Sequence, residues 1–105
     1  MLNLFIERHL AQHPGKKRSD IWKGTDSISK QLFSDITKKE GYKTKKDKLV
    51  ILAAQLQLSV EELNQLLKAA GFGLSQADEI ENKIIHAFTS KDYGSVEQLL
   101  LPSSI

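Results

Sequence analysis

Donor side chains gather on one short stretch of this sequence, where they could bind nucleic acid. On a helix over residues 28–39, one face carries the polar residues Lys30, Gln31, Ser34, Thr37 and Lys38. The opposite face carries apolar residues at offsets of three and four, namely Ile28, Leu32, Phe33 and Ile36. Ammonium, amide and hydroxyl groups can donate to base edges and phosphates. The pattern fits a DNA recognition helix with an apolar back, and it also fits an ordinary amphipathic helix with a solvated polar face.

The positions of these donors divide them into two sets. Lys30, Gln31 and Ser34 lie near the start of the helix on its outward face, so we predict that they contact base edges in the major groove. We predict phosphate contacts from the ends of the helix and from the lysine-rich segment that follows it, namely Ser29, Lys38, Lys39, Lys43, Lys45 and Lys46. A run of lysines is also common on a surface that only faces water. These lysines indicate phosphate binding mainly because they lie next to the predicted recognition helix.

The net charge of +2 conceals a strong asymmetry along the chain. Residues 16–48 contain eleven Lys and Arg against five Asp and Glu, a balance of +6. Residues 49–105 contain three Lys against seven Asp and Glu, a balance of −4. Positive charge concentrated on one segment is typical of a protein that binds a polyanion.

Other kinds of chemistry have little support in the sequence. There is no cysteine, which excludes disulfides, thiolate catalysis and cysteine-based zinc sites. His9 and His13 have the spacing of metal ligands, but no third ligand follows, so we expect neither a metal site nor a cofactor. We also expect no enzymatic activity, because no convergent set of catalytic groups is evident.

The apolar segments are short. None approaches the about 18 residues of a membrane-spanning helix, and the first ten residues lack the core of a signal peptide. We therefore expect no membrane association and a cytoplasmic location.

Helical periodicity recurs through the chain, and no segment alternates as a strand would, so we predict an all-α fold. Helices are expected over 2–12, 20–24, 28–39, about 49–58 and 60–70, with further helices beginning at Ser75 and Ser95. Ser59 with Glu62 predicts a capping box, and Gly71 a helix end. The predicted core includes Leu49, Leu52, Leu56, Leu63 and Leu67. The sixth helix is expected to bury Ala77, Ile80, Ile84, Ile85 and Phe88.

Two segments resemble a known family. SDIWKGTDSISKQLFSDI resembles the helix-turn-helix of the phage-repressor (Cro/C1-type) or XRE family, and KTKKDKLVILAAQLQLSVEELNQLLKAAGF is similar to that family's fourth and fifth helices. The resemblance implies a five-helix lambda-repressor-like DNA-binding domain over residues 1–72. Residues 73–105 would form a helical extension packed on that domain, with dimerisation as one role for it. Members of the family usually act as dimeric transcriptional regulators, which implies double-stranded DNA and a second copy of the chain as partners.

The sequence departs from the family pattern in two places. Asp26 and Ser27 stand where glycine and an apolar residue are common, and Asp35 lies on the flank of the expected recognition helix. Two functions therefore stay open. One is a sequence-specific transcriptional regulator, a repressor or antitoxin-like protein, that inserts helix 28–39 into the major groove. The other is a protein-interaction module, an adaptor or inhibitor, that keeps the fold and has lost DNA binding.

Overall fold

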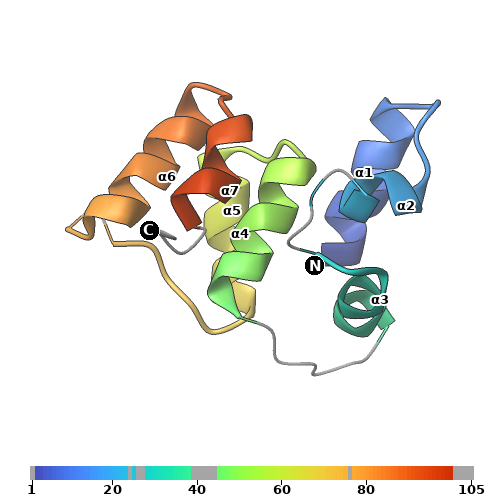
Figure 1. Cartoon of the computed structure of the whole chain (residues 1–105), viewed down its shortest axis with the longest axis horizontal. Coiled ribbons are helices and arrows are strands. Elements are labelled where there is room, and N and C mark those ends of the chain that lie inside the picture. The colour runs from blue at the N-terminus through green and yellow to red at the C-terminus, as the bar shows by residue number, and fades with distance from the viewer. Residues whose placement is uncertain (1, 24, 26–27, 39–44, 76, 101–105) are drawn as a thin grey trace.

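The computed structural model describes residues 2–23, 25, 28–38, 45–75 and 77–100, and these form helices without any strand. Figure 1 shows the helices in order: α1 Leu2–Gln12, α2 Arg18–Lys23, α3 Lys30–Lys38, α4 Lys46–Gln55, α5 Val60–Ala69, α6 Glu79–Thr89 and α7 Gly94–Leu100. The all-α prediction is confirmed for this part of the chain. Five of these helices precede residue 72 and two follow it.

Helix α4 lies at the centre of the core because its neighbours cover it on several sides. It contacts α2, α5 and α7. Its buried residues are Leu49, Val50, Ile51, Leu52, Ala53 and Ala54, which explains why this segment is apolar almost without interruption. The predicted core leucines on α4, at its C-cap and on α5 are all buried, with at most 3% of their surface exposed.

Helix α5 begins and ends as the sequence predicts. The Ser59 hydroxyl accepts a hydrogen bond from the Glu62 amide at 3.2 Å, and the Glu62 carboxylate accepts one from the Ser59 amide at 3.0 Å. At the other end Gly71 adopts φ 86, and the Phe72 amide donates to the Leu67 carbonyl at 2.8 Å. This geometry is a Schellman motif, in which a glycine takes the left-handed position.

The starts of α2 and α3 differ from the prediction. Helix α2 begins at Arg18 rather than at residue 20, and the Asp20 carboxylate in its first turn accepts a hydrogen bond from the Lys17 amide at 2.9 Å. Helix α3 begins at Lys30 rather than at residue 28. Ile28 is buried ahead of the helix, and the Ser29 hydroxyl accepts from the Leu32 amide at 3.0 Å. Ser29 therefore supplies the N-terminal cap of α3.

The sixth helix also begins later than the sequence suggests. Asp78 caps α6 by accepting a hydrogen bond from the Glu81 amide at 3.0 Å. The expected burial of Ala77 and Ile80 is wrong, since both are exposed. The buried residues of α6 begin further along, at Ile84, Ala87 and Phe88. Ile84 and Phe88 of the predicted stripe are buried and Ile85 is partly buried, whereas Ala77 precedes the helix and Ile80 lies in its first turn.

The C-terminal helices contact the earlier part of the chain. Helix α6 contacts α5, and α7 packs between α4 and α6 (Figure 1). The Tyr93 hydroxyl donates to the Leu58 carbonyl at 3.1 Å, and the Thr25 hydroxyl donates to the Glu97 carboxylate. These contacts join α7 and its approach to the segments flanking α3 and α5. The domain boundary at residue 72 stays a prediction.

Candidate nucleic-acid interface

Helix α3 lies at one edge of the molecule, beneath α1 and α2 and on the side away from α6 (Figure 1). Phe33 on its inner face is buried, and Leu32 and Ile36 are partly buried against the core. Lys30, Gln31 and Lys38 are exposed. The apolar face of this helix therefore faces inward and much of its polar face is open to solvent, as the periodicity predicts.

Contacts from α1 and α2 hold α3 in this position. The Asn3 amide donates to the Thr37 carbonyl at 2.9 Å, and its carbonyl oxygen accepts from the Arg18 guanidinium at 3.3 Å. The same guanidinium lies 5.8 Å from the centre of the Phe33 ring. Arg18 was absent from the predicted site. It is the first residue of α2 and follows Lys16 and Lys17, and its exposed side chain beside α3 could also contact a phosphate.

The three predicted base-contacting residues all lie on α3, and their environments differ. Lys30 and Gln31 are exposed, whereas Ser34 is half-buried. The Gln31 amide donates to the Asp35 carboxylate at 2.9 Å. Bidentate recognition of adenine uses both the amide nitrogen and the amide oxygen of a glutamine. Gln31 would keep its second N–H and its oxygen while bound to Asp35.

The predicted phosphate-contacting residues do not all point to one surface. Lys38 and Lys45 are exposed, and the exposed Ser29 hydroxyl keeps a proton to donate while its oxygen caps α3. Lys46 instead forms an ion pair with Glu81 of α6 at 2.9 Å, with 29% of its side chain exposed. To contact a phosphate, Lys46 would have to leave this partner. Lys39 and Lys43 lie outside the described residues.

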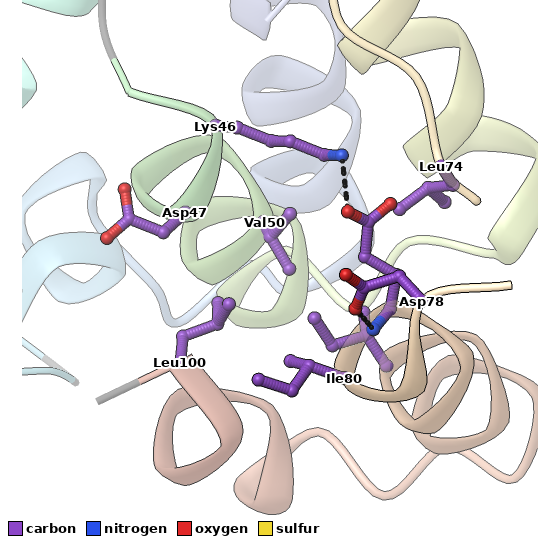
Figure 2. Close-up of a pocket in the computed structure, with 9 residues that line it drawn as sticks. Lys46, Asp47, Val50, Leu74, Asp78, Ile80 and Leu100 are labelled. Carbon is purple, nitrogen blue, oxygen red and sulfur yellow. Dashed lines mark hydrogen bonds and ion pairs between the residues drawn. The ribbon is translucent and has the colours of Figure 1, made fainter. Parts of the chain in front are cut away.

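The Lys46–Glu81 pair borders a groove of about 360 Å³ between α4, α6 and α7. Figure 2 shows Val50, Ile80 and Leu100 on its apolar walls, with Lys46, Asp47 and Asp78 around them. Ile80, which is 49% exposed, lines this groove. Asp78 is occupied in capping α6.

Exposed positive charge is concentrated around α2 and α3. The exposed basic residues of residues 16–45 that the structure describes are Lys16, Lys17, Arg18, Lys23, Lys30, Lys38 and Lys45. Exposed carboxylates occur on the later elements, for example Glu61 on α5 and Glu79 on α6. The charge asymmetry of the sequence therefore extends to the solvent-exposed side chains of the folded chain.

Two further observations apply to the described part of the chain. None of its helices has the length and apolar character needed to cross a bilayer. It also contains no group of three or more His, Cys, Asp or Glu side chains arranged to hold a metal ion.

Comparison with protein-family models, with curated proteins and with solved structures found no match to this chain.

Proposed function

We propose that this chain is a sequence-specific regulator of the XRE type that binds double-stranded DNA by inserting α3 into the major groove. The observation that carries the proposal is the orientation of α3. Its buried Phe33 faces the core, while Lys30 and Gln31 are exposed at its N-terminal end. Residues near the start of a recognition helix are the ones that reach base edges in helix-turn-helix proteins. The proposal includes a non-catalytic role in the cytoplasm.

The surrounding charge supports DNA as the ligand. Arg18, Lys38 and Lys45 are exposed at or beside the ends of α2, α3 and α4. Contacts from such residues to phosphates would set the orientation of the protein, while α3 carries the sequence information. Electrostatic attraction of this kind supplies most of the non-specific affinity and weakens steeply with salt.

Substitutions on α3 test the two kinds of contact separately. Sites selected from a random duplex library provide the specific DNA, and an unselected duplex provides the non-specific DNA. Gln31→Ala should weaken binding to the selected site by about 1–3 kcal/mol and leave non-specific binding nearly unchanged. Lys38→Ala should weaken both and lower the salt slope by about one. Fluorescence anisotropy at several salt concentrations measures all of these quantities.

Lys68→Ala is the matched control, because Lys68 is an exposed lysine on α5, remote in sequence from the basic segment. It should change neither affinity nor salt slope. If Gln31→Ala and Lys38→Ala both bind DNA as the wild type does, with circular dichroism showing intact helices, α3 does not bind DNA.

A protein-interaction module is the second candidate, and the Gln31–Asp35 hydrogen bond favours it. A carboxylate on the flank of α3 would repel a phosphate, whereas a protein partner could accommodate it. Under this alternative the outward face of α3 would contact another protein.

A further inference from the structure

A polar cavity of about 260 Å³ lies between α1, α2 and the C-terminal end of α4. Four basic or protonatable side chains line it: His9, His13, Lys16 and Lys17. Two neutral amide side chains, Gln55 and Gln57, line it from the side of α4. A cavity with this lining offers many hydrogen-bond donors and a local excess of positive charge.

The backbone around the end of α1 brings these groups together. His13 Nδ1 donates to the His9 carbonyl at 2.9 Å, and the two rings lie with their centres 4.3 Å apart. The Lys16 amide donates to the His13 carbonyl at 2.9 Å, which turns the chain back beside the histidines. Gln57 adopts φ 56, a left-handed conformation that is uncommon outside glycine.

The charges facing His9 are predominantly positive. Burial lowers the pKa of His9, and the nearby His13 and Lys16 lower it further, while a hydrogen bond to the Leu56 backbone opposes the shift. The acidic side chain in the lining is Asp20, whose carboxylate already accepts the Lys17 amide. The residues from α4 are uncharged, so a bound anion would relieve the repulsion among the cationic groups.

We propose that this cavity binds a tetrahedral oxyanion of the phosphate or sulfate type. The lysines and the protonated imidazoles would donate charge-assisted hydrogen bonds to its oxygens, with the glutamine amides completing the shell. The phosphoryl group could belong to a small molecule or to a DNA backbone, since both present the same oxygens.

A metal ion fits the cavity less well. The two lysines that line it would repel a cation, and the described residues include no group of three or more His, Cys, Asp or Glu side chains arranged to hold one. The cavity is also separate from the contacts of α3. Asn3, which touches α3, is six residues before His9, or about 9 Å along the helix axis.

Sulfate is the probe that tests this site, because its charge stays constant while histidine titrates. Sulfate is added to the full chain against sodium chloride of equal ionic strength, and binding is followed by amide and imidazole NMR. The resonances of His9, His13, Lys16 and Lys17 should shift and saturate. The affinity for sulfate should be at least about fivefold higher near pH 5.5 than near pH 8, because a protonated imidazole attracts the anion.

Paired variants locate the site. Lys16→Gln combined with Lys17→Gln should weaken sulfate binding by about tenfold, since two charged donors are lost. Lys68→Gln removes a remote lysine and should leave binding unchanged. The proposal is overturned if sulfate causes no saturable shift, or if the double variant binds as tightly as the wild type. Zinc shifts at the two histidines without any sulfate shifts would also overturn it.

The source of the phosphoryl group follows from one more titration. If a DNA duplex moves the same resonances and sulfate competes with it, the cavity receives a backbone phosphate. If DNA leaves these resonances in place while sulfate moves them, the ligand is a small phosphorylated or sulfated molecule. Either result supports the oxyanion site, and neither result depends on whether α3 binds DNA.

Discussion

Several of the residues predicted to contact a ligand already have partners inside the protein. Ser29 caps α3, Gln31 donates to Asp35, and Lys46 pairs with Glu81. A ligand would have to share or replace these contacts, so the affinity gained at each residue is reduced by the internal interaction that is lost. The exposed Lys30 and Lys38 have no such contact among the described interactions and should contribute most directly.

His9 gives a prediction about acid stability. Burial and neighbouring positive charge lower its pKa in the folded chain below the unfolded value of 6.5. The unfolded chain therefore takes up a proton first, so the free energy of unfolding should fall as the pH drops below about 6.5. His9→Gln removes this titration, so the free energy of unfolding of the variant should fall less steeply with decreasing pH. Urea denaturation in chloride buffers at several pH values measures this dependence.

The exposed His86 on α6 provides the control for that experiment. The free energy of unfolding of the His86→Gln variant should fall with decreasing pH as that of the wild type does. If the free energy of unfolding of the His9→Gln variant falls with pH as steeply as that of the wild type, the folded environment of His9 does not disfavour its protonated form.

Whether a contact between two residues could be predicted depends on how far apart the two residues lie in the sequence. The Ser59–Glu62 capping box could be predicted because both residues belong to one helical turn. The Arg18–Asn3 and Thr25–Glu97 contacts join residues 15 and 72 positions apart, and local patterns carry no signal for them. For the same reason Arg18 was missed as a member of the candidate interface.

At the scale of the elements, periodicity identifies the helices better than it identifies their ends. The apolar spacing of α3 predicts its inward face, yet the helix begins two residues late because Ser29 rather than an earlier residue caps it. Ile80 misled the prediction for α6 in a similar way. It extends the apolar pattern into a first turn that borders the groove beside Lys46 rather than the closed core.

Leu56 tests the account of the core around α4. This side chain is 3% exposed at the C-terminal end of α4. Leu56→Ala should lower the free energy of unfolding by about 2–5 kcal/mol, because it removes buried apolar atoms and leaves a cavity. Chemical denaturation measures the loss.

Leu4, with 70% of its surface exposed, is the comparison for Leu56. Leu4→Ala should change stability by no more than about 0.5 kcal/mol. Similar losses for the two variants would contradict the assignment of Leu56 to the core.

At the scale of the whole molecule, the chain separates its charges. Among the described residues, exposed basic residues outnumber exposed carboxylates around α2 and α3, whereas the later helices carry exposed carboxylates and lysines in similar numbers. Composition along the sequence predicts this separation. It does not predict that α7 packs between α4 and α6, or that Lys46 of the basic segment pairs across to α6, because both depend on how distant elements meet.

A homodimer on DNA is the prediction that belongs to this scale. One recognition helix reads few bases, and a two-fold dimer doubles the contacts on a palindromic site. The sequence places a candidate surface on the last two helices, at Ile85, Phe88, Leu99, Leu100 and Leu101. Ile85, Leu99 and Leu100 are partly exposed, Phe88 is buried in the core, and Leu101 lies outside the described residues. Light scattering with a selected DNA site should give two protomers per duplex. One protomer per duplex would contradict the dimer.

An NMR titration with an unselected duplex tests whether the basic surface around α3 binds DNA, and it needs no knowledge of the operator. At low salt the amides of α3, the start of α2 and the start of α4 should shift, and those of α5 and α6 should stay in place. Adding salt should reverse the shifts, because phosphate contacts release counterions when they form. Shifts confined to α6 and α7, or no shifts at low salt, would contradict the claim.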